Sequence, residues 1–228
     1  MSGKGKVLIG LSGGVDSSVA AALLLEKDYE VVGVMMRIRS NGHYYFAADD
    51  ARRVAEKLSI PFYIVDYENI FKEKVIDYFE KEYREGRTPN PCVVCNRYVK
   101  YKMLLDGALS MGIDYIATGH YARAEYNGIT GRYLLKRARA LEKDQSYFLY
   151  KLTQEQLSKV LFPLGEYTKD EVRKIAEKYE LPVAKKPDSQ EICFINNDND
   201  YAKFICDYTN LKVLPGYFVD KKGNILGK

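Results

Sequence analysis

Residues 6–17 read Lys-Val-Leu-Ile-Gly-Leu-Ser-Gly-Gly-Val-Asp-Ser, and this stretch decides the fold. Residues 6–11 form a short apolar run with β-branched side chains, which is typical of a buried strand. A glycine-rich turn follows at Ser12–Gly14, and residues 17–27 predict a helix with its apolar side chains on one face. A strand, a tight turn and a helix in this order predict the start of a parallel α/β sheet.

The same alternation continues along the chain. Residues 31–36, Phe62–Asp66 and Tyr115–Thr118 predict three further strands, and Tyr133–Lys136 predicts one more. Helices are predicted around residues 51–58, 68–84 and 96–110. The sequence therefore predicts an α/β fold in which helices cover both faces of a parallel sheet.

The pattern changes near residue 150. Thr153–Gln156 and Thr168–Glu171 both match the capping box that begins helices. The last stretch, Pro215–Leu226, predicts a β-hairpin. We therefore expect a catalytic domain over residues 1–162, a small helical domain over 163–212 and the start of a β-rich domain over 213–228.

The composition is that of a globular protein. Of 228 residues, 46% are hydrophobic and 29% are charged, a balance that argues against a disordered chain. The 35 Lys and Arg against 31 Asp and Glu give a net charge of +4, which neither requires nor excludes a polyanionic partner. There is no apolar run of about 18 residues and no room for a signal peptide before the first strand. We expect a cytoplasmic, reduced protein whose four cysteines are metal ligands, catalysts or core residues.

The turn after the first strand predicts a phosphate-binding loop. Its glycines let the backbone approach an anion, and the N–H groups at the helix start then hold that anion. Ser12 and Ser17 add hydroxyl donors, whereas Asp16 repels bare phosphate and is expected to face Mg²⁺ bound to it. The chain has no G-x-x-x-x-G-K-[ST] and no G-x-G-x-x-G, which excludes a Walker loop and disfavours dinucleotide binding.

Ser12–Ser17 resembles the PP-loop of the N-type ATP pyrophosphatases, whose fold is called adenine nucleotide alpha hydrolase-like. These enzymes split ATP between the α and β phosphates and adenylate a substrate. Within this superfamily the sequence resembles the tRNA-specific 2-thiouridylases (the MnmA or TrmU family). The further matching segments are Gly86–Asn96, Ala117–Tyr121, Lys143–Tyr150, Leu161–Gly165 and Asp188–Phe194.

The resemblance implies an ATP-consuming tRNA-uridine 2-sulfurtransferase. Such an enzyme adenylates the C2 oxygen of the wobble uridine, U34, replaces it with sulfur and releases AMP and pyrophosphate. The ATP contacts that it implies are Gly10, Leu11, Ser12, Gly13, Gly14, Val15, Asp16, Ser17, Met36 and Gly119. The tRNA contacts that it implies are Asn90, Pro91, His120, Lys143, Asp144 and Gln145.

Several of these positions also have a plain structural interpretation. Met36 fits ordinary core packing, and a lone histidine such as His120 is often structural. Basic residues gather just before Lys143, where a solvated strand face and a patch that neutralises RNA phosphates are both consistent with the sequence. The basic residues concerned are Arg132, Lys136, Arg137 and Arg139.

The cysteines predict sulfur or metal chemistry. Cys92 and Cys95 form a C-x-x-C on a proline-bounded loop before a helix, and a helix start favours the thiolate. Cys193 lies far along the chain, and Cys206 fits a core position. Three interpretations of Cys92, Cys95 and Cys193 are open. They are unconnected thiols, a redox set that passes a persulfide between Cys95 and Cys193, or a metal site. Three thiolates with an open position suit an iron–sulfur cluster better than structural zinc.

The C-x-x-C departs from the commonest pattern of the family. Many thiouridylases have Asp where this chain has Cys92; in those, the cysteine matching Cys95 is the nucleophile and the one matching Cys193 carries the persulfide. A C-x-x-C with a distant cysteine resembles the cluster-dependent thiolation enzymes, in which three cysteines hold a [4Fe-4S] cluster and the fourth iron binds sulfide. We therefore favour the cluster and keep the persulfide relay as the alternative, with Asp16 and the three cysteines as the catalytic residues.

The expected partners follow from the resemblance. They are the anticodon stem-loop of tRNA and either sulfide or a sulfur-donor protein such as a cysteine desulfurase. The family continues past the residue that matches Lys228 through β-rich domains that help to hold tRNA. A truncated, a proteolysed and a naturally short form all fit the sequence; for a naturally short form we expect a partner subunit, self-association or another RNA to replace that grip. Rival functions are thiolation of another RNA, a PP-loop ligase or amidotransferase that needs no cysteines, and a non-enzymatic RNA- or nucleotide-binding module.

Overall fold

A computed structural model describes residues 4–38, 42–188, 192–195, 200–210 and 215–228. The chain divides into two compact units, Met1–Asp188 and Ser189–Lys228, and each is described here by itself. Among the described helices, none combines the length and the apolar character needed to cross a lipid bilayer.

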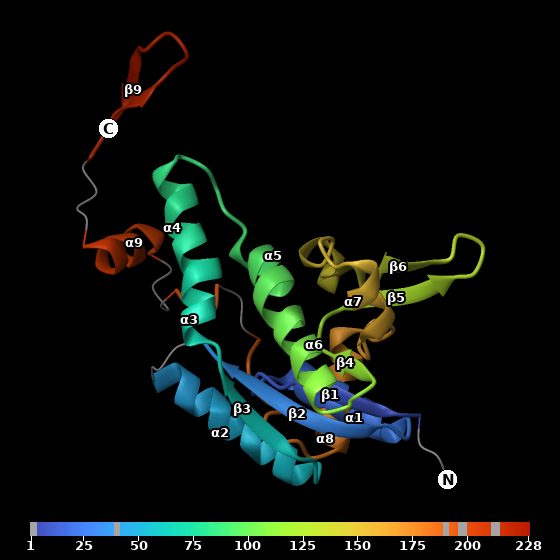
Figure 1. Cartoon of the computed structure of the whole chain (residues 1–228). Coiled ribbons are helices and arrows are strands. Elements are labelled where there is room, and N and C mark those ends of the chain that lie inside the picture. The colour runs from blue at the N-terminus through green and yellow to red at the C-terminus, as the bar shows by residue number, and fades with distance from the viewer. Residues whose placement is uncertain (1–3, 39–41, 189–191, 196–199, 211–214) are drawn as a thin grey trace. The chain divides into compact units, whose positions relative to one another are not determined.

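The first unit is built on a parallel sheet of five strands in the order β3-β2-β1-β4-β7 (Figure 1). The strands are β1 (Lys6–Gly10), β2 (Glu30–Arg37), β3 (Phe62–Asp66), β4 (Tyr115–Ala117) and β7 (Val160–Leu161). The chain runs outward from β1 to β3 and then returns to the other side of β1 as β4. The carboxyl ends of β1 and β4 therefore form a topological switch point, the usual ligand position in open α/β sheets. The predicted parallel α/β fold is confirmed.

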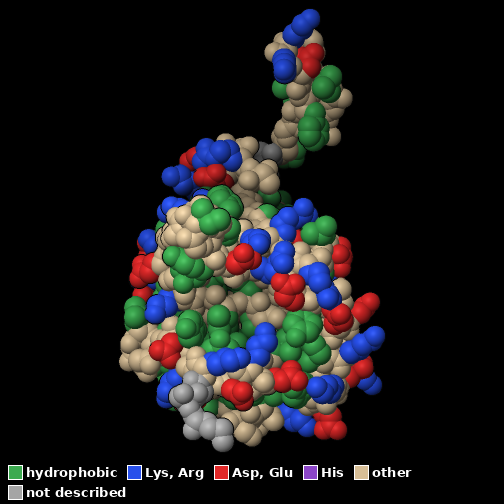
Figure 2. Space-filling view, turned by 90° about the vertical axis from the view of Figure 1, so that its right-hand side faces the viewer, with side chains coloured by type: hydrophobic (Ala, Val, Ile, Leu, Met, Phe, Trp, Pro, Cys, Tyr) green, Lys and Arg blue, Asp and Glu red, His purple; other side chains and the backbone are tan. Residues whose placement is uncertain are grey.

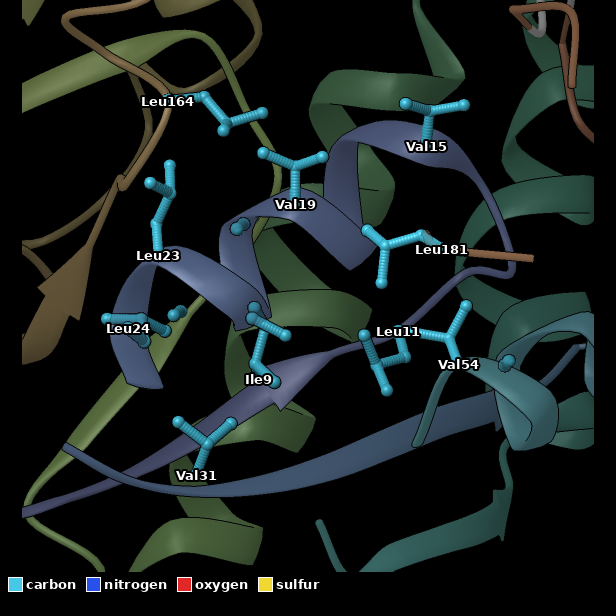
Figure 3. Packing of buried hydrophobic residues seen from close by; sticks show 14 of the residues in the cluster. Ile9, Leu11, Val15, Val19, Leu23, Leu24, Val31, Val54, Leu164 and Leu181 are labelled. Atoms are coloured by element: carbon cyan, nitrogen blue, oxygen red, sulfur yellow. The ribbon is translucent and has the colours of Figure 1, made fainter. Parts of the chain in front are cut away.

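One face of the sheet is covered by α1 (Val15–Glu26) and α2 (Gly42–Lys57), and α8 (Lys169–Lys178) packs against α1. Helix α1 is apolar almost all round its surface, because it lies between the sheet and further chain on its other side. Figure 3 shows Val19 of α1 between Ile9 of the sheet and Leu164 of the later chain. The phosphate loop therefore leads into a helix that is rigidly packed.

The other face is covered by a long helical run that begins earlier than predicted. It consists of α5 (Pro91–Cys95), a π-helical turn (Asn96–Lys100) and α6 (Tyr101–Ser110). The predicted start near residue 96 is wrong by about one turn, because Asn90 caps the helix and Pro91 occupies its first position. Tyr101 and Leu104 are completely buried in the core on this side.

The remaining elements of this unit connect or extend the layers. Helix α3 (Glu68–Phe71), a π-helical turn (Lys72–Ile76) and α4 (Asp77–Arg84) follow β3. After β4 the chain forms an antiparallel hairpin of β5 (Ala122–Asn127) and β6 (Arg132–Arg137). Two 3-10 turns (Leu141–Lys143 and Ser146–Phe148) and α7 (Gln154–Lys159) lead to β7. The capping boxes predicted at Thr153 and Thr168 are both confirmed.

The second unit contains α9 (Tyr201–Thr209) and a hairpin of β8 (Phe218–Val219) and β9 (Ile225–Gly227). The hairpin is the one predicted from the sequence, and the Asp220 carboxylate closes its turn by accepting bonds from the Lys222 and Asn224 N–H groups at 2.8 and 2.9 Å. Helix α8 packs against α1 within the first unit. The predicted domain limits at 162/163 and 212/213 stay predictions.

Candidate functional site

The loop after β1 is closed by its own serines. The Ser12 N–H donates to Ser17 Oγ at 3.2 Å, and the two hydroxyl oxygens lie 3.1 Å apart. Gly14 precedes α1, and no side chain caps the helix there. Since the first N–H groups of a helix have no acceptor within it, they are available to an anion. The loop therefore has the backbone arrangement that the sequence predicts for phosphate binding.

Two glycines of the predicted ATP site are required by close packing. Gly13 has φ +69°, and a Cβ there would collide with the Ala47 carbonyl oxygen of α2. Gly119, just after β4, lies so close to the start of α1 that a Cβ would be 2.7 Å from Ser17 N. The structure therefore brings Gly119 against the phosphate loop, although the two are distant in sequence.

Asp16 already has partners within the chain. Its Oδ1 accepts a bond from the Tyr121 hydroxyl at 2.9 Å and one from Lys169 Nζ at 2.6 Å. Burial and the Asp16 charge raise the pKa of the Tyr121 phenol, which keeps this hydroxyl protonated as a donor. Sequence reasoning missed both partners, and also Lys186, which donates to the Gly13 carbonyl oxygen at 2.9 Å. No sequence motif marks these long-range contacts. The capping box at Thr168 predicts where the helix of Lys169 begins, but not what Lys169 contacts.

His120 is the centre of a polar cluster beside the loop. Its Nδ1 lies 2.7 Å from Thr118 Oγ1 and 3.2 Å from the Tyr101 hydroxyl, and its Nε2 lies 3.4 Å from Lys100 Nζ. Burial, with a smaller effect of Lys100, lowers the pKa of the imidazole well below its usual value. His120 is therefore neutral near pH 7. Met36 is partly buried and packs against the core on the α6 side, which fits its structural interpretation.

Cys92 and Cys95 lie one helical turn apart in α5 and are both partly buried. Asn90 Oδ1 caps this helix by accepting from the Val93 N–H at 3.2 Å. Burial raises the pKa of both thiols, and nearby Lys100 opposes that shift without reversing it. The expectation that the helix start favours the thiolate is therefore wrong for these two residues, because desolvation outweighs the favourable charge.

The other two cysteines belong to the second unit. Cys193 is exposed, and Cys206 is partly buried on α9. Among the residues that the structure describes, no three His, Cys, Asp or Glu side chains are placed to hold a metal ion. The grouping of Cys92, Cys95 and Cys193 stays a prediction, since the third thiol lies outside the first unit.

The segment predicted to contact tRNA is tied into the fold beside Tyr121. Gln145 Oε1 accepts from the Tyr121 N–H at 3.0 Å, and the Asp144 carboxylate accepts from the Ala138 N–H and the Ser146 hydroxyl at 2.8 and 2.7 Å. Lys143 Nζ lies 3.4 Å from the Asp188 carboxylate. Asp144 and Gln145 therefore hold the segment in place, and their contact with tRNA stays a prediction.

Three of the four basic residues of the β6 region have acidic partners. Lys136 pairs with Glu125 at 2.7 Å, Arg139 pairs with Glu171, and Arg137 lies 3.9 Å from the Asp144 carboxylate. Figure 2 shows basic and acidic side chains interspersed over the face it presents. This arrangement favours the solvated-face interpretation of the cluster over a dedicated phosphate-binding patch.

Known proteins resemble this chain in sequence and in fold. The family model for the tRNA methyl transferase HUP domain matches residues 5–197. The tRNA-specific 2-thiouridylase MnmA of Acetivibrio thermocellus is 56% identical over 99% of this chain and 66% of its own length. The enzyme of the same name from Lachnoclostridium phytofermentans is 58% identical over 98% of this chain and 65% of its own length. The chain thus spans just under two thirds of the length of these curated relatives.

A solved structure has the same fold. It is the U34-tRNA thiolase NcsA from Methanococcus maripaludis with its [4Fe-4S] cluster, which superposes with a TM-score of 0.53 at 24% identity. The match covers 92% of this chain and 65% of that one. The family-model match over most of the chain, together with the high identity to the MnmA enzymes, shows that the chain belongs to the tRNA-specific 2-thiouridylase (MnmA) family of the PP-loop superfamily.

Proposed function

We propose that this chain carries the catalytic domain of an ATP-dependent tRNA-uridine 2-sulfurtransferase that acts on U34. One observation carries the proposal: the phosphate loop and His120 lie against the helical run that carries the cysteine turn. Gly119 packs on the start of α1, and the next residue, His120, lies 3.4 Å from Lys100 Nζ. Lys100 in turn acts electrostatically on Cys92 and Cys95. A nucleotide on the loop and a sulfur carrier at the thiols would therefore share one site.

This arrangement suits a two-step substitution. In the first step the C2 oxygen of uridine attacks the α-phosphorus of ATP, and pyrophosphate leaves into the loop at Gly10–Ser17. In the second step a sulfur nucleophile attacks C2, and the bond from C2 to oxygen breaks with AMP as the leaving group. Adenylation is needed because oxide is a poor leaving group. The target base has to leave its stack, which an anticodon loop allows.

The first unit offers some of the ligands for the two inorganic cofactors proposed from the sequence. The Asp16 carboxylate, 34% exposed at the helix start, is a suitable ligand for the Mg²⁺ that accompanies ATP. Cys92 and Cys95 offer two thiol ligands on one helical turn, with Cys193 proposed as the third ligand of a [4Fe-4S] cluster. When bound, such a cluster supplies an open iron position for sulfide.

A persulfide relay is the alternative use of the same thiols. In it, the terminal sulfur of a Cys193 persulfide attacks C2 and AMP leaves. Cys95 then attacks the Cys193 sulfur, which releases the thiolated base and leaves a Cys95–Cys193 disulfide for an external thiol to reduce. Burial raises the pKa of Cys95, so the relay and metal coordination both have to remove a proton from this thiol. Tight metal binding releases the thiol proton and so overcomes the effect of burial. The proposed partners are the tRNA anticodon stem-loop and a source of sulfide. The proposed domains cover residues 1–162, 163–212 and 213–228.

Iron analysis separates the cluster from the relay. After anaerobic reconstitution, iron and acid-labile sulfide would be measured on the wild type, Cys92→Ala and Cys206→Ala. The cluster predicts about four irons per chain in the wild type and in Cys206→Ala, with loss in Cys92→Ala. Iron-free wild-type protein would contradict the cluster and favour the relay.

Exchange of labelled pyrophosphate into ATP tests the adenylation step itself. The proposal predicts exchange that requires tRNA and that survives replacement of all three cysteines by Ala, because the thiols act only after adenylation. An amidotransferase would instead show full turnover with ammonia in the triple variant. A protein without exchange on any RNA would be a binding module.

A further inference from the structure

Two lysines from the last part of the first unit reach the phosphate loop. Lys169, the first residue of α8, places its Nζ 2.6 Å from Asp16 Oδ1 and 2.8 Å from Asp188 Oδ1. Lys186, in the segment after α8, donates to the Gly13 carbonyl oxygen at 2.9 Å and to Asp50 Oδ2 at 2.6 Å. One lysine therefore lies at the helix end of the loop and the other at its glycine turn. We call these two residues the lysine pair.

The lysine pair is held in place by an arginine of the same helix. Arg173 donates to the carbonyl oxygens of Ala184 and Lys186, both at 3.3 Å, and to Asp188 Oδ1 at 3.0 Å. Asp188 in turn receives Lys169. Helix α8 therefore positions Lys169 directly and fixes the backbone that carries Lys186. Both ammonium groups are fixed relative to the loop by elements of one compact unit.

The exposure of Lys169 differs from that of an ordinary surface lysine. Only 12% of its side chain is exposed. Lys178 on the same helix is 67% exposed and lies 3.5 Å from Glu26, the kind of surface pair that contributes little to stability. Removing a charged ammonium from water is unfavourable, so the fold keeps Lys169 at the loop against a desolvation cost. That cost indicates a role beyond holding the surface together.

Charge shows what that role is. The carboxylates that face the loop are Asp16, Asp50 and Asp188, and the loop's own donors are uncharged N–H and hydroxyl groups. Arg53, Lys143 and Arg173 pair with two of these acids, and the lysine pair adds the positive charge that makes the surface favourable for a polyphosphate. Burial by itself would raise the pKa of Asp50 and Asp188, but the hydrogen bonds from Lys186 and Lys169 bring both below the ordinary value, so these two acids are ionised at neutral pH.

The donor count leaves room for a ligand. An ammonium group has three N–H donors. Lys169 uses two on Asp16 and Asp188, and Lys186 uses two on Gly13 and Asp50. Among the described residues, one donor of each lysine thus has no acceptor, and both lysines lie beside the loop that is built for an anion.

We propose that the lysine pair binds the β- and γ-phosphates of ATP and then the pyrophosphate that leaves. This inference rests on the proposed function, in which pyrophosphate departs into the loop. The remaining N–H of each lysine bonds to a phosphate oxygen, so the bonds from the lysines to the acids are retained. Asp188 also keeps its bond from Arg173, and Asp16 keeps its bond from Tyr121. The lysines thus compensate the charge that grows on the leaving group while AMP becomes attached to the substrate.

Calorimetric titration with sodium pyrophosphate and with ATP tests this assignment without any turnover. The variants are Lys169→Met and Lys186→Met, and Lys178→Met is the matched control on α8. Loss of a charge-assisted bond to phosphate predicts a roughly ten- to hundredfold weaker affinity for both ligands in each test variant. Lys169→Arg should recover part of the loss, because it keeps the charge. The control should bind as the wild type does.

The outcomes are distinguishable. Wild-type protein that binds neither ligand would contradict the proposed function itself. Wild-type binding with affinities unchanged within twofold in both test variants would overturn the role of the lysine pair and leave the function intact. If a Met variant fails to fold, reductive methylation of the wild type decides. Pyrophosphate should then protect Lys186 and leave Lys178 reactive, and equal modification of Lys186 with and without pyrophosphate would refute the proposal.

Discussion

A single substitution at His120 tests the polar cluster beside the phosphate loop. In the folded chain, burial and Lys100 hold its pKa well below 6.5, whereas in the unfolded chain it titrates near the ordinary value of about 6.5. As the pH falls from 7 to 5, the unfolded state therefore takes up a proton that the folded state does not. The free energy of unfolding should fall by at most about 1.4 kcal/mol per pH unit from this group. The free energy of unfolding, measured with urea at pH 7, 6 and 5, should change less with pH in His120→Gln than in the wild type. Equal changes with pH in the two proteins would contradict a buried neutral imidazole.

Gly119 tests the close approach of β4 to the phosphate loop. A methyl group there would lie 2.7 Å from Ser17 N and 2.8 Å from the Asp16 carbonyl carbon, so the backbone at the start of α1 has to move. We expect Gly119→Ala to lower the free energy of unfolding by about 1–3 kcal/mol and to weaken ATP binding, since it displaces the N–H groups of the loop. Gly128→Ala is the control, because no atom lies within 4 Å of the added methyl there. Urea unfolding and ATP titration give both quantities, and an unaltered Gly119→Ala protein would refute the packing.

At the scale of the element, the cysteine turn depends on its cap. Asn90 Oδ1 accepts from the Val93 N–H, in the first turn of the helix that carries Cys92 and Cys95. Asn90→Ala should cost about 0.5–2 kcal/mol of stability, whereas Asn90→Asp should keep the cap and most of that stability. Thermal unfolding of the two variants measures the difference. If Ala and Asp behave alike, the cap does not hold the turn and a direct role of Asn90 in RNA binding gains support.

Elements whose pattern is local could be predicted, and those formed by distant contacts could not. The strand, turn and helix around Ser12–Ser17 follow from neighbouring residues alone. Strand β7 has only two residues, Val160–Leu161, and exists because it adds to β4. Strand β5 mixes Arg and Glu with Ala and is fixed by pairing with β6 rather than by an apolar pattern. Neither β5 nor β7 has a period long enough to be recognised in the sequence.

The candidate site divides in the same way. The loop residues and the cysteines are recognisable from short motifs, because backbone approach and thiol chemistry each require particular residue types. Lys169 and Lys186 escape such reasoning, since they contact Asp16 and Gly13 across 153 and 173 positions of the chain. The direction of the cysteine pKa shift was also out of reach, because the burial of the α5 turn depends on how the whole unit packs.

At the scale of the whole molecule, the parallel sheet brings the carboxyl ends of β1 and β4 together. The loop, His120 and the cysteine turn then converge in one unit, while Cys193 is carried by the other. The proposed chemistry needs both units in one working chain. Activity should therefore require Cys193 as well as Cys92 and Cys95, although binding of ATP should not.

Nucleoside analysis of the product tests this account most directly. Unmodified tRNA with U34 would be incubated anaerobically with the reconstituted chain, ATP, Mg²⁺ and sulfide, digested, and examined by mass spectrometry. The account predicts 2-thiouridine at U34 with one AMP formed per sulfur inserted, and no thiolation in Cys95→Ala or Cys193→Ala. Unmodified uridine in a protein that binds both ATP and the tRNA, or thiolation that persists without these cysteines, would contradict it.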